Sequence, residues 1–144
     1  MSNQSAERAG ALMEFEFPVG LPAFEQERRF RLLTRPEFSP LAVLESAGRP
    51  ELRFVCAPAQ LLDAGYRVET SEEDEAVLEC GPEDAGAGHL LCLAILTFPE
   101  SGPPTANLMA PVLLNPGTGR GVQSIRPECG YSHCHPLRGG EPCS

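Results

Sequence analysis

The sequence predicts an all-β, or mostly β, domain in which about nine short strands form a sandwich or a small barrel-like sheet, with at most one or two short helical turns. Short segments of alternating apolar and polar residues recur along the chain, separated by turn signals. The chain also has 15 prolines and 14 glycines among its 144 residues, which leaves few stretches long enough for a helix. Both observations favour many short strands.

The first predicted strand shows the pattern most clearly. Met13, Phe15 and Phe17 fall on one face of an extended chain, and Glu14 and Glu16 fall on the other. Eight further segments of similar character follow, in chain order 30–32, 41–43, 52–56, 66–68, 76–78, 89–97, 108–114 and 122–126. Their spacing is typical of an all-β domain.

Two stretches carry helical signals. Residues 59–64 predict a single turn after a proline. Residues 71–78 have a weak capping pattern, Ser71 with Asp74, so a short helix there competes with the strand predicted over 76–78. Either helix would be short.

The chain length, with 42% hydrophobic residues, suits one domain with one core. We expect a mobile tail over residues 1–11, a single domain over 12–138 and a frayed end over 139–144. The longest uninterrupted apolar stretch, Leu90 to Leu96, is far shorter than the roughly 20 residues that a membrane-spanning helix needs, so no membrane association is expected. The polar start lacks the apolar core of a signal peptide, which favours the cytoplasm.

Charge is distributed unevenly along the chain. There are 20 acids, 11 arginines and no lysine, for a formal net charge of −9. Between Arg67 and Arg120 the only basic residue is His89, and this window holds nine acids: Glu69, Glu72, Glu73, Asp74, Glu75, Glu79, Glu83, Asp84 and Glu100. Such a window repels phosphate backbones and attracts a basic protein, so direct nucleic-acid binding is disfavoured. The alternative is a solvated acidic loop that only aids solubility.

Cysteine and histidine gather near the end of the chain. Cys129, His133, Cys134 and His135 suggest a metal site or a cysteine-histidine hydrolase. The thiol spacing is poor for structural zinc, and adjacency in sequence does not orient a nucleophile and a base. We therefore expect no catalytic residue, no metal and no cofactor. A small metal- or thiol-dependent enzyme using this cluster stays as the alternative function.

The other cysteines suggest no chemistry. Without a signal peptide, reduced thiols are expected, although the total of six is even. Cys56 and Cys92 lie inside apolar runs, so we expect them to pack as small hydrophobic residues.

The run from Asn107 to Asn115, Asn-Leu-Met-Ala-Pro-Val-Leu-Leu-Asn, is strongly apolar and contains no acid, base or nucleophile. Pro111 has no N–H to donate to a strand ladder, so it predicts a sheet edge or a bulge. An edge is a place where a partner can dock. The alternative is an ordinary core strand flanked by two turn asparagines.

Four separated motifs resemble one family. They are Phe-Pro-Val-Gly-Leu-Pro-Ala-Phe-Glu at 17–25, Phe-Val-Cys-Ala-Pro at 54–58, the run 107–115, and Gly-Val-Gln at 121–123 followed by Tyr131. In this order, and over most of the chain from Met13 to Leu137, they resemble FliW, the flagellar assembly factor family.

The resemblance implies a small, barrel-like, mostly β protein without enzymatic activity. It implies that the protein binds newly made flagellin in the cytoplasm. It further implies that the freed protein binds the RNA-binding translational repressor CsrA and stops it repressing flagellin mRNA. We accordingly expect flagellin and CsrA as partners, and a monomer when neither is bound.

Two sets of residues are candidates for these contacts. The acidic window offers Glu72, Glu73, Asp74 and Glu75 to CsrA, because arginine-bearing surfaces that hold phosphates also attract carboxylates. The apolar run offers Asn107, Met109 and Asn115 to flagellin. For each asparagine alone, a structural role in capping a turn is the preferred interpretation.

Ala23 departs from the family pattern, which commonly has glycine at this position. If the turn over residues 20–24 required positive φ there, alanine would cost about 1 kcal/mol of stability. We therefore expect a turn of another type.

Overall fold

The computed structural model describes residues 11–126 and 129–137. Its elements are β1 (Ala11–Glu16), β2 (Arg29–Thr34), η1 (Pro36–Phe38), β3 (Ala42–Ser46), β4 (Arg53–Pro58), α2 (Ala59–Leu62), α3 (Glu72–Leu78), α4 (Glu83–Gly86), β5 (Leu91–Thr97), β6 (Thr105–Asn115), β7 (Arg120–Gln123) and β8 (His135–Pro136).

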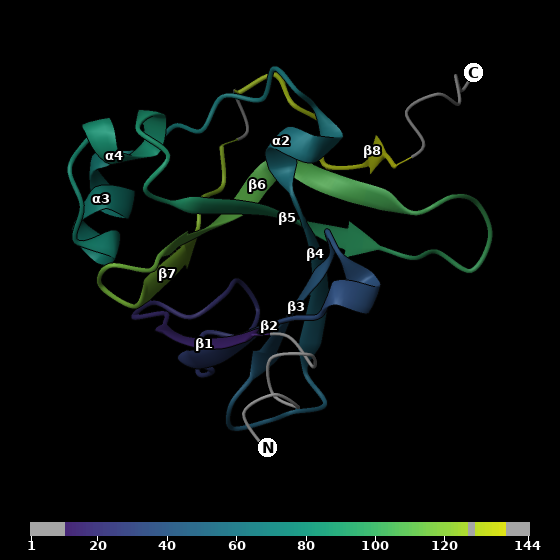
Figure 1. Cartoon of the computed structure of the whole chain (residues 1–144), viewed down its shortest axis with the longest axis horizontal. Helices are drawn as coiled ribbons and strands as arrows, with labels where there is room; N and C mark the ends of the chain where they lie inside the picture. The colour runs from purple at the N-terminus through teal and green to yellow at the C-terminus, as the bar shows by residue number, and fades with distance from the viewer. Residues whose placement is uncertain (1–10, 127–128, 138–144) are drawn as a thin grey trace.

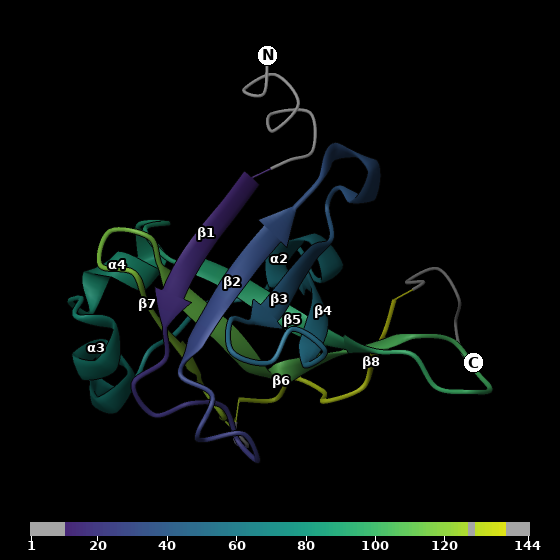
Figure 2. The same cartoon turned by 90° about the horizontal axis from the view of Figure 1, so that it is seen from below.

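Seven strands of the described chain close into a barrel, and one more lies outside it. The strand order is β5-β4-β3-β2-β1-β7-β6, and β5 pairs with β6 to complete the ring. All neighbours are antiparallel except β1 and β7, which are parallel. The short strand β8 pairs with the first two residues of β6, Thr105 and Ala106. Figures 1 and 2 show β1 to β4 side by side, with α3 and α4 packed at one end. The mostly β, barrel-like prediction is confirmed.

Strand predictions from alternation are confirmed for all seven barrel strands. Two other predicted strands are wrong. Residues 76–78 lie in α3, where the capping signal outweighs three residues of β-like composition, and residues 66–68 form an irregular segment. The turn predicted over 59–64 is confirmed as α2, whereas α4 and β8 were not predicted.

The barrel interior is filled by the apolar face of each strand. Phe15 and Phe30 are direct partners across β1 and β2 and both are buried, while Glu14 pairs with Arg31 on the outer face. The rings of Phe17 and Phe30 meet edge to face with centroids 5.1 Å apart. These contacts bury the faces that the alternation indicated.

Two cysteines belong to this packing. Cys56 is fully buried, and Cys92 is half-buried against apolar neighbours. Burial raises the pKa of each thiol to about 12. Their predicted role as small hydrophobic residues is confirmed.

The turn after β1 contradicts one expectation. Ala23 has φ 73°, in the left-handed region, so the expected turn of another type is wrong. Gly20, in the same turn, has φ 67°, and a Cβ there would lie 2.5 Å from the Glu25 Cα. Its neighbourhood therefore excludes a side chain at residue 20, while residue 23 carries one at a conformational cost.

The barrel begins one residue before the predicted domain boundary. β1 begins at Ala11, so this last residue of the predicted tail belongs to the barrel. Residues 1–10 and 138–144 lie outside the described residues, as does Cys143. Within the described ranges, no helix has the length and apolar character needed to cross a membrane.

Candidate partner-binding surfaces

α3 begins at a capping box that the sequence signalled. The Ser71 backbone N–H donates to the Asp74 carboxylate (3.2 Å), and the Asp74 N–H donates to the Ser71 hydroxyl (3.0 Å). The same Asp74 oxygen accepts a 2.6 Å hydrogen bond from the Ser124 hydroxyl. Asp74 is only 8% exposed. Of the four acids offered to CsrA, Asp74 is therefore the one whose carboxylate is used inside the fold.

The C-terminal end of α3 is held by the hairpin of β6 and β7. The Leu78 carbonyl accepts hydrogen bonds from the Asn115 amide and the Thr118 hydroxyl, both at 2.9 Å. One residue further, Glu79 lies 3.2 Å from the Arg120 guanidinium. These contacts satisfy a carbonyl that a short helix leaves unpaired, and they fix α3 against the barrel.

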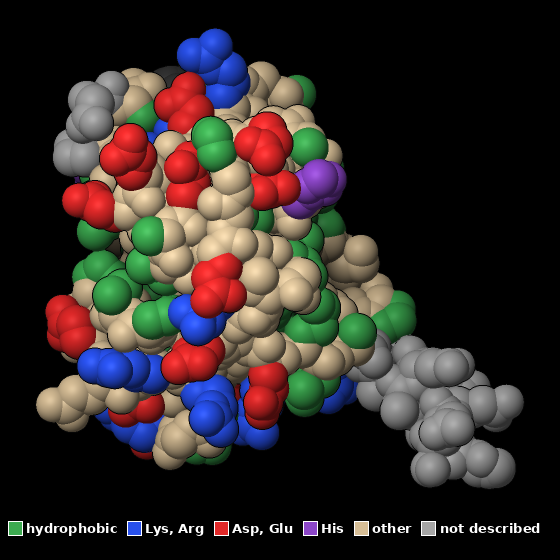
Figure 3. Space-filling view, turned by 90° about the vertical axis from the view of Figure 1, so that its left-hand side faces the viewer, with side chains coloured by type: hydrophobic (Ala, Val, Ile, Leu, Met, Phe, Trp, Pro, Cys, Tyr) green, Lys and Arg blue, Asp and Glu red, His purple; other side chains and the backbone are tan. Residues whose placement is uncertain are grey.

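The remaining acids of this region point outward. Glu72 and Glu73 are exposed and form no ion pair within the described chain, while Glu75 is half-buried and accepts a 2.7 Å hydrogen bond from Thr70. We call α3, α4 and the exposed or half-buried carboxylates on and beside them (Glu72, Glu73, Glu75, Glu79, Glu83 and Asp84) the acidic lobe. Figure 3 shows acidic side chains gathered over this part of the surface and mixed charges at the opposite end.

His89, three residues after the end of α4, is the one histidine of the acidic window. His89 Nδ1 and Asp84 Oδ1 are 2.6 Å apart, and the other Asp84 oxygen accepts from the Gly81 N–H at 2.7 Å. The hydrogen bond from His89 lowers the pKa of the Asp84 carboxyl, with help from the Gly81 N–H. Both hydrogen bonds favour the ionised form of the Asp84 carboxyl.

The proline-containing run forms most of β6. Leu93 pairs with Val112, yet Ile95 pairs with Asn107, so residues 108–111 of β6 lie opposite Ala94 alone. Pro111 falls in this bulge, as its missing N–H predicted. The edge alternative is wrong, because β6 runs between β5 and β7.

The two asparagines of this run have structural contacts. The Asn107 side-chain oxygen accepts from the N–H groups of Met109 (3.1 Å) and Ala110 (3.0 Å), which shapes the bulge. Asn115 is 8% exposed, and its amide oxygen accepts from the Gly117 N–H at 3.0 Å. Of the three predicted flagellin contacts, only Met109 has a half-exposed side chain without a hydrogen-bonding role.

The cysteine and histidine residues near the end of the chain do not converge. Cys129 accepts from the Tyr131 N–H (3.4 Å), whereas Cys134 accepts from the Ser132 hydroxyl (3.6 Å). His135 lies in β8 opposite Ala106, and His133 is exposed. Among the described residues, no group of three or more His, Cys, Asp and Glu side chains is placed to hold a metal ion.

A groove that the sequence did not signal lies beside the acidic lobe. Two adjoining hollows of about 390 and 480 Å³ share Gln60, Val68, Ala85 and Gly86 in their walls. One wall is the segment 66–69, the other is α4 with the two residues after it, and the floor is the start of β5. No motif marks it, because its residues come from three separate segments.

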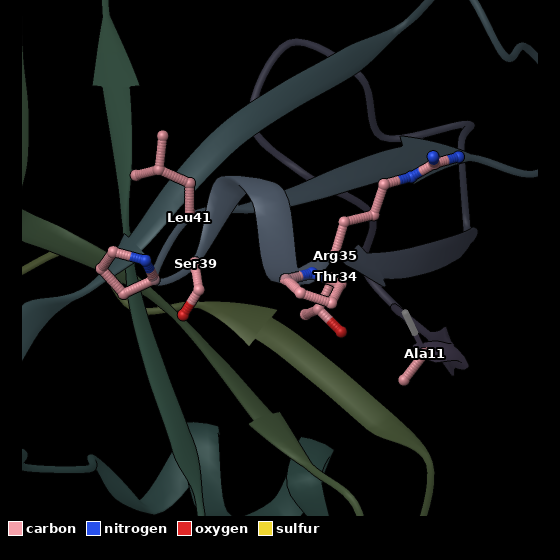
Figure 4. A pocket seen from close by; sticks show the side chains of 7 residues that line it. Ala11, Thr34, Arg35, Ser39 and Leu41 are labelled. Carbon is pink, nitrogen blue, oxygen red and sulfur yellow. The ribbon is translucent and has the colours of Figure 1, made fainter. Parts of the chain in front are cut away.

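A second hollow lies at the other side of the barrel, between β1, β2 and η1. Its described lining is mainly apolar, and Figure 4 shows the Arg35 side chain extending away from Ser39 and Leu41. Among these lining residues there is no acid, histidine or cysteine that could act as a catalytic group.

Fold and surfaces together define a small closed β-barrel protein with a rigid acidic lobe and, in the part described, no assembled catalytic centre. The family model described as FliW protein matches residues 4–137. The chain belongs to the FliW family.

Individual relatives support this assignment. The flagellar assembly factor FliW of Syntrophomonas wolfei is 36% identical over 132 residues, covering 87% of this chain and 82% of that protein. The corresponding protein of Bacillus licheniformis is 34% identical over 128 residues, covering 88% and 86%. A crystal structure of the flagellar assembly factor FliW superposes with a TM-score of 0.76 at 28% identity, covering 86% of this chain and 84% of that chain.

Proposed function

We propose that this protein is a cytoplasmic, non-enzymatic flagellar assembly factor that acts by exchanging partners. It binds flagellin, and when free it binds CsrA and prevents CsrA from repressing flagellin translation. Membership of the FliW family supports the assignment to flagellar assembly. Binding two protein partners requires recognition surfaces and no active site. The unbound protein is a monomer in this proposal.

The acidic lobe is the observation that carries the CsrA part of the proposal. An RNA-binding protein needs a cationic surface to hold phosphates, and that surface attracts carboxylates. Glu72 and Glu73 are exposed on a helix that is fixed to the barrel at both ends. A fixed helix presents its charges without losing conformational freedom on binding, which strengthens association.

Met109 is the remaining candidate of the predicted flagellin set. Its side chain is half-exposed on the bulge of β6, and a bulge re-aims side chains from the regular pleat. Flexible thioether side chains adapt to apolar partner surfaces. Met109→Ala tests this contact by titration with flagellin; unchanged affinity would remove Met109 from the interface.

The CsrA proposal is tested by reversing charge in the lobe without touching its buried contacts. The variant Glu72→Lys/Glu73→Lys/Glu83→Lys is compared with Glu14→Lys/Glu16→Lys/Glu37→Lys, which makes the same charge change at exposed positions of β1 and η1. We expect the lobe variant to associate with CsrA more slowly, and to lose the salt dependence of the wild-type rate. Equal rates for the two variants at low salt would contradict the proposal.

A further inference from the structure

The groove beside the acidic lobe exposes a piece of strand edge. β4 ends at Pro58, which pairs with Leu93, and the chain then turns into α2. β5 begins two residues earlier, at Leu91, so Leu91 and Cys92 have β6 on one side and the groove on the other. Figure 1 shows α2 and α4 on the same side of β5. A strand edge at the floor of a groove can pair with an extended segment of a partner.

The groove is mainly apolar at its centre. Leu91 is 36% exposed there, beside Val68 and Ala85. Gly86 and Gly88 form the rim, and a Cβ at either position would have nothing within 4 Å. Small rim residues leave room for a partner's main chain to approach β5.

One wall of the groove is held rigidly. The Tyr66 hydroxyl donates to the Leu108 carbonyl at 2.7 Å and accepts from Arg126 at 3.1 Å, while the Gln60 amide donates to the Tyr66 carbonyl at 3.2 Å. The rings of Tyr66 and Tyr131 pack with centroids 4.4 Å apart. A wall fixed by the rest of the fold exists before the partner arrives, so little ordering is needed on binding.

The charges beside the groove favour a partner segment that contains basic residues. Glu69 lies in the fixed wall, and the opposite wall begins beside Glu83 and Asp84, which form the acidic first turn of α4. Arg67 and Arg126 lie 3.6 and 3.1 Å from Glu69, so the one carboxylate of this wall is already paired with two arginines. An apolar floor next to the acidic first turn of α4 fits an extended segment that has an apolar side chain and, on the α4 side, an arginine or lysine.

We infer that this groove receives such a segment of CsrA, added as a short strand to β5 at Leu91 and Cys92. The inference rests on the proposed function, and it adds a place and a mode of binding to the charge attraction of the acidic lobe. The carboxylates steer the partner, and the groove holds it.

The test fills the groove without straining the backbone. Gly86→Trp places an indole in the open space, since residue 86 does not have positive φ and its Cβ meets nothing. Gly48→Trp is the matched control at an exposed turn between β3 and β4, where the nearest atom to a Cβ is 3.8 Å away. A second pair, Leu91→Ser against Leu12→Ser, removes an exposed leucine inside and outside the groove.

Calorimetric titration with CsrA and with flagellin gives the readout, and thermal melting checks the fold. We expect Gly86→Trp to weaken CsrA binding by about tenfold or more, Leu91→Ser by a smaller factor, and both controls to bind as wild type. If Gly86→Trp fails to fold, Leu91→Ser decides. Wild-type binding of CsrA with no effect of either groove variant would overturn the groove while leaving the proposed function intact. Loss of flagellin binding alone would also overturn it, and no binding of CsrA by the wild type would overturn both proposals.

Discussion

The Ser124 hydroxyl donates a 2.6 Å hydrogen bond to the Asp74 carboxylate, and this contact joins the first turn of α3 to the segment after β7. An isolated helix of seven residues is unstable in water. α3 is therefore stabilised by its tertiary contacts: Asp74 at its start and the paired Leu78 carbonyl at its end. The exposed acids of the lobe keep their positions because the buried acid is fixed.

Replacing Asp74 by alanine should lower the free energy of unfolding more than replacing one of its exposed neighbours. Asp74→Ala removes the helix cap and leaves the buried Ser124 hydroxyl without its acceptor, so we expect a loss of about 2–4 kcal/mol in the free energy of unfolding. Glu73→Ala should change it by less than about 0.5 kcal/mol. Urea denaturation of the two variants checks the difference, and a small loss for Asp74→Ala would show that the contact with Ser124 is not stabilising.

Asn115 should matter for stability more than for binding. Asn115→Ala removes one of two donors to the Leu78 carbonyl and the acceptor for the Gly117 N–H, so we expect a loss of about 1–3 kcal/mol. Asn107→Ala, which loosens the bulge, should cost about 1 kcal/mol. Thermal melting and flagellin titration well below the melting temperature separate the two roles. Lost flagellin binding with an unchanged melting temperature would assign the asparagine to the interface instead.

Ala23→Gly should stabilise the protein. At φ 73° alanine is strained and glycine is not, although glycine raises the entropy of the unfolded chain. We expect a net gain of about 0.5–1 kcal/mol in the free energy of unfolding. Ala47→Gly, at a position outside the left-handed region, serves as the control and should give no gain. A destabilised Ala23→Gly would show that this turn does not hold residue 23 at positive φ.

The thiols should differ in reactivity. Cys134 is exposed, whereas burial raises the pKa of Cys56 and Cys92 to about 12, so at pH 8 these two remain protonated in the folded state. We expect a thiol reagent to label Cys134 rapidly and to label Cys56 and Cys92 only after unfolding in urea. Peptide mass mapping of the labelled native protein checks this. Rapid native labelling of Cys56 would contradict its position in the core.

Local patterns were enough to predict the barrel strands. The alternation of apolar and polar residues placed Phe15 and Phe30 inside, and the missing N–H of Pro111 indicated the bulge of β6. The same kind of reasoning misassigned residues 76–78, because a strand-like composition over three residues is weaker than a capping box.

Local sequence patterns could not predict the contacts between residues far apart in the chain. Asp74 has the appearance of one surface acid among four, and only the fold brings Ser124 to it. The groove has no motif, because its floor, walls and rim meet only when β5, α4 and the segment 66–69 are packed together. Charge composition indicated the acidic lobe, but not the strand edge beside it.

Translation of a reporter behind a flagellin mRNA leader, in a purified system repressed by CsrA, tests the partner-switching account most directly. The account predicts that adding this protein restores translation and that a subsequent excess of flagellin restores repression, while the Glu72→Lys/Glu73→Lys/Glu83→Lys variant has a weaker effect. Persistent repression at a large excess of the wild-type protein would contradict the account.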